Sequence, residues 1–143
     1  NADLIVIKKI KGQKHNIVVN ILGNLLYVKV HAANISDTIA AVPILEKTVQ
    51  IYPTIRAFSG DLGYRGTAAT FVSKKLKLTL QISEKRVHEP GPFKVLPKRW
   101  IVERTFAWLG GFRRLAKDFE ILVTTAENMI RIAMLSLIVA KCL

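Results

Sequence analysis

Short apolar runs separated by turn residues occupy the first part of the chain and predict strands. Residues 16–20 and 25–30 are rich in β-branched and aliphatic side chains, and Gly23 and Asn24 stand between them. Because Gly and Asn tolerate the positive φ of a tight turn, the two runs predict a β-hairpin. Residues 4–7 form a similar run and predict a further strand ahead of the hairpin.

Helical spacing of apolar positions follows the hairpin. Ser36 and Asp37 are favourable N-cap residues, and the helical pattern after them ends before Pro53. The apolar positions that recur at helical intervals are Ile39, Val42, Leu45 and Val49. Pro43 lies inside this pattern, which predicts either a kink or a helix that begins at the proline.

The rest of the chain predicts a strand–helix–strand unit, an irregular segment and two further helices. In chain order these are residues 55–59, 67–76, 78–82, 84–98, 98–116 and a helix from 124 onward. Gly110 and Gly111 predict a break in the first of the two helices. Thr124 and Glu127 have the spacing of a capping box in the second. That second helix is apolar nearly all round, so we expect it to be buried.

This order of elements predicts a single mixed α/β domain over residues 1–143, with helices packed on a small sheet. The chain has 22 Lys and Arg against 10 Asp and Glu, a formal charge of +12. Such an excess is typical of proteins that bind nucleic acid phosphates or anionic membranes. The longest apolar run, residues 132–140, falls short of the ~20 residues of a bilayer helix, so no membrane contact is expected. Nucleic acid is therefore the expected partner.

Cysteine content and the first residues also limit the class of protein. The single cysteine, Cys142, excludes an internal disulfide framework and a Cys-rich zinc site, and it fits a reducing compartment. The chain begins without Met and without the basic-then-apolar order of a secretory signal. We therefore expect a fragment of a cytoplasmic protein.

The basic residues form two groups. The first, Lys8, Lys9, Lys11 and Lys14, flanks Gly12, and the second comprises Lys98, Arg99, Arg104, Arg113, Arg114 and Lys117. Residues 98–118 hold six basic and two acidic side chains, a poor balance for an ordinary solvated helix face. We expect these groups to contact DNA phosphates, which supply most of the non-specific affinity for nucleic acid.

Two acidic residues are candidates for chemistry. Asp61 follows a predicted strand and lies between Gly60 and Gly63, at the type of strand end that lines functional crevices in α/β sheets. The alternative is a surface Asp-x-Gly turn. Glu103 shares a predicted helix face with Arg99 and Arg114, and small residues lie between them. The alternative is an ordinary i,i+4 ion pair with Arg99. Trp100, Trp108 and Phe112 are expected in the core.

Three stretches together resemble a known family. They are RWIVERTFAWL at residues 99–109 with FRRL and KDFE after it, DLGYRG at residues 61–66, and the basic segment KKIKGQKH at residues 8–15. In this order they resemble bacterial insertion-sequence DDE transposases of the family-five type, over nearly the whole chain. The resemblance implies a ribonuclease-H-like fold, that is, a mixed sheet flanked by helices.

The resemblance also implies a chemistry. Members of the family use three carboxylates, Asp-Asp-Glu, to hold two divalent cations, Mg²⁺ or Mn²⁺, for phosphoryl transfer on DNA. The resemblance places the second Asp of this set at Asp61 and the Glu at Glu103, as catalytic and metal-binding residues. The residues expected to bind DNA are Lys9, Lys11, Lys14, Arg65, Lys98, Arg99, Arg104, Arg113 and Arg114, and for Arg99 the resemblance itself implies a DNA contact near the metals. Double-stranded DNA is the implied partner, and family members act as homo-oligomers in the bacterial cytoplasm, at the nucleoid.

The chain departs from the family pattern near its start. The first Asp lies roughly twenty residues ahead of the basic segment in the family, whereas Asp3 precedes Lys8 by five positions. We therefore expect an N-terminally truncated catalytic domain that lacks its first strand and its first catalytic Asp. Two other hypotheses stay open at this point. One is a catalytically inactive, basic DNA-binding remnant, and the other is an RNA-binding protein of ribosomal type.

Overall fold

The computed structural model describes residues 2–10, 13–83, 99–117 and 119–143, with the backbone alone at residues 2–10 and at 99. The predicted irregular segment 84–98 lies outside the described residues. The strands are β1 (Ala2–Ile10), β2 (Gln13–Val19), β3 (Leu25–Ala32), β4 (Ala57–Asp61) and β5 (Thr79–Ser83). The helices are α1 (Asp37–Ile51), α2 (Thr67–Lys74), α3 (Arg99–Gly110) and α4 (Val123–Cys142), with 3-10 turns η1 (Leu62–Tyr64) and η2 (Arg113–Leu115).

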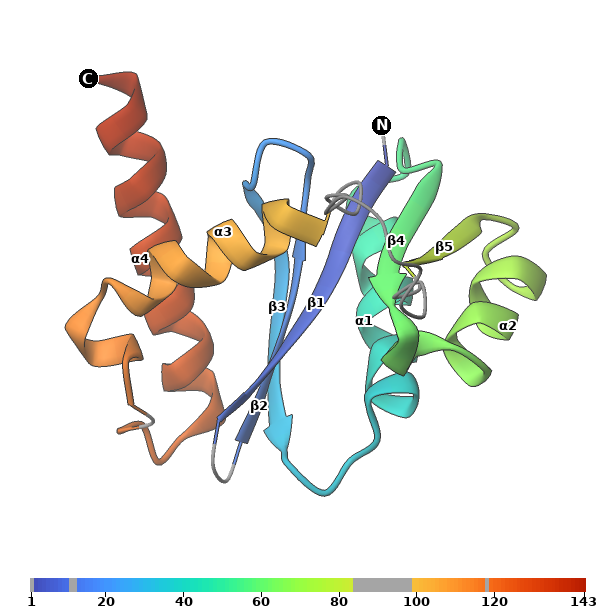
Figure 1. The fold of residues 1–143 in the computed structure, drawn as a ribbon, viewed down its shortest axis with the longest axis horizontal. Coiled ribbons are helices and arrows are strands. Elements are labelled where there is room, and N and C mark those ends of the chain that lie inside the picture. Colours follow the sequence, from blue (N-terminus) through green and yellow to red (C-terminus); the bar gives the residue numbers. More distant parts are fainter. Residues whose placement is uncertain (1, 11–12, 84–98, 118) are drawn as a thin grey trace, which may run out of the picture.

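The five strands form one mixed sheet in the order β3-β2-β1-β4-β5 (Figure 1). Neighbouring strands are antiparallel in the β1–β2 and β2–β3 pairs and parallel in the β1–β4 and β4–β5 pairs. The predicted mixed α/β class is therefore confirmed. The expected gap at the first strand is not observed, because β1 pairs on both sides and occupies the centre of the sheet. The strand predicted at residues 4–7 is present within β1, and its pairing with both β2 and β4 was not predicted.

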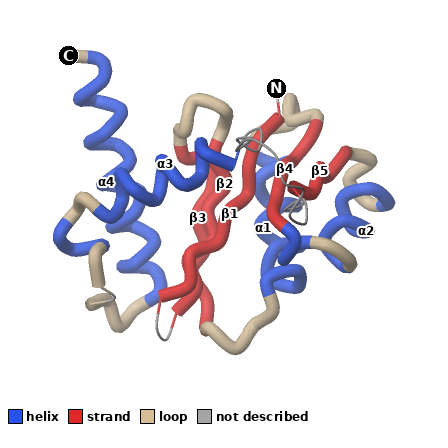
Figure 2. Tube along the Cα trace, in the orientation of Figure 1, coloured by secondary structure: helices blue, strands red, loops and turns tan. Residues whose placement is uncertain are grey.

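Helices cover both faces of the sheet (Figure 2). Successive side chains of a strand point to opposite faces. Accordingly, Ile17 and Val19 pack in the core under α3 and α4, whereas Val18 packs with α1 and α2. Two apolar layers thus sandwich the sheet, and each is closed by a pair of helices.

The predicted hairpin is present, and its turn is specified by two residues. Gly23 has φ +85°, a left-handed value that a side chain would strain. The Asn20 side chain accepts hydrogen bonds from the backbone N–H groups of Leu22 and Asn24, each at 3.0 Å. A Cβ on Gly23 would also come within 3.0 Å of the Arg104 guanidinium. The turn is therefore the place where the hairpin meets α3.

Three boundary predictions need correction. α1 begins at Asp37 and carries Pro43 inside it, so a helix beginning at Pro43 is wrong. α3 ends at Gly110, as the glycine pair predicted, but Arg113 and Arg114 then lie in the separate turn η2. β4 ends two residues later than predicted, so that Asp61 is its last residue.

The predicted capping box and the predicted burial of α4 are both wrong. Leu122 is the N-cap residue of α4 and makes no side-chain cap bond, while Glu127 is buried and accepts a hydrogen bond from Val30 N–H at 3.0 Å. Ile132 and Leu135 are 57% and 61% exposed, and the carboxyl end of α4 extends past the other elements (Figure 1). Among the described residues, α4 is the one helix whose length and composition would allow it to cross a membrane. Its amino half packs on the sheet.

Candidate functional site

Asp61 lies at the carboxyl end of β4, where the chain turns sharply into η1. Its side chain is exposed, and Oδ1 accepts a hydrogen bond from Gly63 N–H at 3.0 Å. This is the local geometry of an Asp-x-Gly turn. It also lies at the edge of the sheet where the parallel strands β1 and β4 end, the position expected for a functional carboxylate in an α/β sheet.

The same edge of the sheet gathers residues from β2 and α1. Because β2 runs antiparallel to β1, its first residues lie at this edge, and α1 begins here after β3. Lys14 Nζ lies 2.7 Å from Asp37 Oδ1 and also donates to the Ile35 carbonyl at 2.8 Å. The side chain of Lys14 is only 12% exposed. A basic residue predicted to contact DNA is therefore held by an acid of the same chain.

The carboxylates of Asp37 and Asp61 approach each other across Gly63. A Cβ built on Gly63 would lie 3.1 Å from Asp61 Oδ1 and 3.5 Å from Asp37 Oδ2. Both oxygens therefore lie within 3.5 Å of one point. The absence of a side chain at Gly63 keeps that point open. Sequence reasoning treated Asp37 as a helix N-cap and missed its proximity to Asp61.

Tyr64 lies directly after Gly63 and is buried against Gly60, whose Cβ position would come 3.0 Å from the ring. Burial raises the pKa of the Tyr64 hydroxyl far above its ordinary value, and the charges of Asp61 and Asp37 raise it further. Within the described part of the chain, this hydroxyl has no hydrogen-bond partner. The Tyr64 hydroxyl is therefore a buried donor whose ionisation is opposed by both carboxylates.

Glu103 is exposed on the outer face of α3, while Ile101 and Thr105 of the same helix are buried. This division of faces confirms the predicted amphipathic helix. The prediction that Arg114 shares a helix face with Glu103 is wrong. α3 ends at Gly110, and the Arg114 side chain forms an ion pair with Glu120 at 2.7 Å. α3 packs across β1, the strand beside β4 (Figure 1).

The donor chemistry of the two predicted catalytic acids fits a hard divalent cation, since carboxylate oxygens are the ligands that Mg²⁺ and Mn²⁺ prefer. Among the described residues, no group of three or more His, Cys, Asp or Glu side chains is placed to hold a metal. Asp3 lies on β1 in register with Phe58, three residues before Asp61, and no Asp or Glu follows it in β1. No acidic residue of β1 is therefore in register with Asp61.

The basic residues predicted to bind DNA are spread over several elements. Arg65 follows η1 and is exposed, and Arg113 and Arg114 are exposed in η2. Lys11 and Lys98, and the side chains of Lys9 and Arg99, lie outside the described residues. The described members therefore present charge both beside Asp61 and beyond the end of α3.

Arg104 has a role in the fold that sequence reasoning missed. Its guanidinium lies 4.5 Å from the ring centroid of Trp100 and 4.6 Å from that of Trp108, and it donates to the Leu22 carbonyl at 3.0 Å. The i,i+4 spacing of the three residues is the signal that could have predicted this stack. Trp100 is 46% exposed, so its predicted place in the core is wrong.

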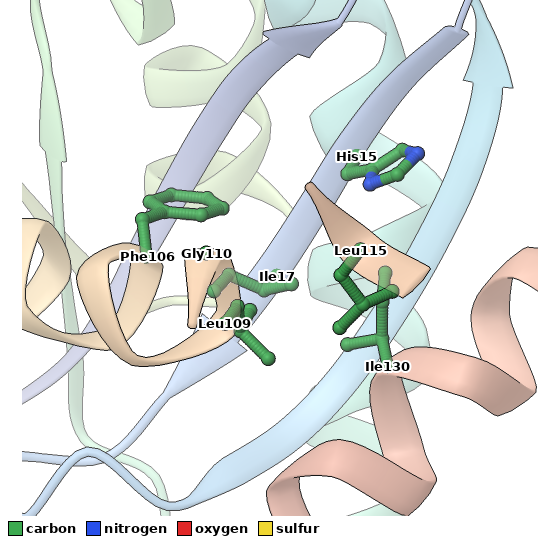
Figure 3. A pocket seen from close by; sticks show the side chains of 7 residues that line it. All are labelled: His15, Ile17, Phe106, Leu109, Gly110, Leu115 and Ile130. Carbon is green, nitrogen blue, oxygen red and sulfur yellow. The ribbon is translucent and has the colours of Figure 1, made fainter. Parts of the chain in front are cut away.

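A small pocket opens between β2, α3, η2 and α4 (Figure 3). It is lined by His15, Ile17, Phe106, Leu109, Gly110, Leu115 and Ile130. Aliphatic and aromatic side chains dominate this lining, and Asp61 and Glu103 are not part of it. The pocket is a gap in the apolar layer under α3 and α4, and its chemistry does not suit a phosphate or a cation.

Comparison with known proteins places these features in a family context. The transposase DDE domain family matches residues 7–138. The chain is 31% identical over 121 residues to the "Putative transposase for insertion sequence element IS402" of Burkholderia cepacia, and the match covers 76% of this chain and 54% of the relative. The chain thus spans about half the length of the curated relative that it matches.

Among solved structures, the catalytic core domain of BIV integrase superposes with a TM-score of 0.58 at 12% identity, over 94% of this chain and 81% of that chain. At this identity the likeness shows the fold alone. The integrase core is ribonuclease-H-like, so the fold that the sequence motifs implied is confirmed.

Proposed function

Because this chain belongs to the transposase DDE domain family, we propose that it forms the catalytic part of an enzyme that cuts and joins DNA strands at transposon ends. The observation that carries this proposal is the exposed carboxylate of Asp61 at the carboxyl end of β4. It lies at the functional edge of a sheet whose fold matches a retroviral integrase core.

In this proposal Asp61 and Glu103 hold the divalent cations, Mg²⁺ or Mn²⁺. The metal would activate the attacking hydroxyl and stabilise the leaving oxygen of an in-line phosphoryl transfer. Asp61 is fixed by the Gly63 N–H, and Glu103 is carried on α3, whose buried side packs on the sheet. Both acids are exposed, so a DNA backbone has access to each.

Basic residues around these acids would bind the phosphates. The side chains of Arg65, Arg113 and Arg114 are exposed and accessible to DNA, and Arg114 stays 64% exposed while it pairs with Glu120. Lys9, Lys11, Lys98 and Arg99 belong to the same proposal on sequence grounds. Lys14 and Arg104 already have partners in the fold, so we expect them to contribute charge rather than direct phosphate contacts.

A second candidate function is a non-catalytic DNA-binding remnant. The register of β1 favours it, because Asp3 is three residues short of the level of Asp61. A protein with Asp61 and Glu103 but no third carboxylate would bind DNA through its charge of +12 and leave it uncut. The hypothesis of an RNA-binding protein of ribosomal type has no support from the family match.

Transposases of this type act on paired DNA ends, so we expect homo-oligomers on double-stranded DNA in the bacterial cytoplasm, at the nucleoid. We expect no membrane partner, since the amino half of α4 packs on the sheet through Ala126, Ile130 and Met134.

Plasmid nicking tests the proposed activity. The protein would be incubated with plasmid DNA that carries the transposon ends, with and without Mg²⁺. We expect Mg²⁺-dependent nicks that Asp61→Asn and Glu103→Gln each reduce by about 100-fold or more, while the exposed acid variant Glu46→Gln keeps full activity. Equal nicking by all four proteins would overturn the assignment of the two acids.

A further inference from the structure

Trp100 is a large aromatic residue that the fold leaves open to solvent. It lies in the first turn of α3 and is 46% exposed. The exposed side of α3, within the described residues, consists of Trp100, Glu103, Ala107 and Gly110, whose spacing places them on one face of the helix. A Cβ on Gly110 would meet nothing within 4 Å. A flat ligand or a polymer strand can therefore reach the tryptophan and the acid together.

The Trp100 ring is supported from within the fold. The Arg104 guanidinium lies over it, 4.5 Å from its centroid, and also donates to the Leu22 carbonyl at 3.0 Å. The same guanidinium lies 4.6 Å from the centroid of Trp108, and the Lys141 ammonium of α4 lies 4.1 Å from that centroid. Rings and cations thus alternate in a series that joins α3, α4 and the hairpin turn. Trp100 is the outer end of this series.

The chemistry of this surface fits an unpaired nucleobase. Aromatic side chains bind unpaired bases by stacking, and this contact tolerates any base because every base has a π face. A ring that is already ordered by Arg104 loses little conformational entropy when a base stacks on it. The bases of an intact duplex stack on one another, so the ring would meet a base that has left the helix.

The position of Glu103 indicates which strand would supply the base. Residues three apart on a helix have neighbouring side chains, with about 5 to 6 Å between their Cβ atoms. Trp100 and Glu103 have this spacing, and both are exposed. A DNA strand with a phosphate at the metal proposed for Glu103 would therefore bring an adjoining base within reach of the Trp100 ring.

We propose that Trp100 binds the DNA strand at Glu103 by stacking on one of its unpaired bases, with Arg104 supporting the ring. The inference rests on the proposed function for the identity of the strand. An apolar side chain of a protein partner would also fit a tryptophan. The guanidinium behind the ring and the formal charge of +12 favour a polyanion.

Tryptophan fluorescence tests the contact, because Trp100 and Trp108 are the two tryptophans of the chain. Trp108→Phe leaves Trp100 as the reporter and keeps a ring beside Arg104. The probe is a single-stranded thymidine oligonucleotide added to the 143-residue chain. We expect the emission of Trp100 to fall by about twofold at saturation, because a stacked base quenches it. Trp100→Phe is the matched control, in which the emission of Trp108 should not change.

Affinity measurements form a second arm that keeps Trp108 in place. Trp100→Leu removes the ring and should weaken binding of the oligonucleotide by about tenfold, whereas Trp100→Phe should stay within about threefold. Tyr52→Leu, at an aromatic residue that is 36% exposed after α1, should bind like the unmodified chain. The affinity of Trp100→Leu for duplex DNA of the same length should stay within about twofold, because phosphate contacts dominate there. This arm decides the question if Trp108→Phe fails to fold.

The outcomes separate this inference from the proposed function. Absence of oligonucleotide binding, unquenched Trp100 emission in the complex, or equal losses for single strand and duplex in Trp100→Leu would each overturn the stacking site and leave a protein partner as the occupant of the ring. Plasmid nicking is measured independently. Stacking without nicking would refute the transposase activity alone, and nicking without stacking would refute the role of Trp100 alone.

Discussion

Lys14 and Asp37 form an ion pair, with Nζ 2.7 Å from Oδ1, that joins the start of β2 to the start of α1. The pair lies at the edge of the sheet where Asp61 ends β4. Since Lys14 is nearly buried and also donates to the Ile35 carbonyl, it is fixed by the fold rather than by a ligand. The edge that carries the proposed chemistry is therefore preorganised by a contact between residues that lie far apart in the chain.

Replacing the ammonium of this pair should destabilise the domain. Lys14→Met keeps the stem and removes both hydrogen bonds, so we expect unfolding free energy to fall by about 1 to 2 kcal/mol. Urea denaturation measures the loss, and Lys47→Met on the exposed side of α1 is the control. A loss in Lys14→Met no larger than in the control would show that the pair contributes nothing.

Tyr64 should make the protein sensitive to alkali. Burial, with a further contribution from Asp61 and Asp37, raises the pKa of its hydroxyl in the folded protein, whereas the unfolded chain ionises near pH 10. The folded state therefore binds the proton more tightly, and stability is full below about pH 10 and falls as pH rises further. Tyr64→Phe should flatten this alkaline decline in unfolding free energy, and the more exposed Tyr52→Phe should not. Parallel declines in both variants would contradict the prediction.

Glu127 is expected to be a structural acid. It is 6% exposed, its Oε1 accepts from Val30 N–H at 3.0 Å, and Lys29 and Arg131 lie beside it. Glu127→Ala leaves the Val30 donor without its partner and should cost about 2 to 4 kcal/mol. Glu127→Gln retains an acceptor oxygen and should cost less. Hydrogen exchange at the Val30 amide would report the difference, and equal protection in the two variants would refute this role.

Local elements could be predicted from sequence because their signals are local. The hairpin follows from Gly23 and Asn24 between two β-branched runs, and the end of α3 follows from Gly110. Asp61 at a strand end could also be predicted, since a buried strand and a glycine-rich turn adjoin in the sequence. These features depend on neighbours within a few residues.

The features that sequence reasoning missed depend on distant partners. Glu127 has the spacing of a capping box, but its partner Val30 lies 97 residues away, and a buried edge-strand donor outweighs a local cap. Asp37 is indistinguishable from a helix cap until β4 brings Asp61 next to it. The exposure of Leu135 could not be predicted either, because an apolar helix carries no mark of where the sheet beneath it ends.

We propose that Asp61 and Glu103 share a metal centre on DNA, and iron-directed cleavage is the most direct test of this site. Fe²⁺ would replace Mg²⁺ in the complex with duplex DNA, and ascorbate and peroxide would generate radicals that cut the polypeptide near the metal. We expect cuts at the end of β4 and in α3 together, and Asp61→Asn should abolish both. Cuts confined to one of the two elements, or cuts that persist in Asp61→Asn, would contradict a shared centre.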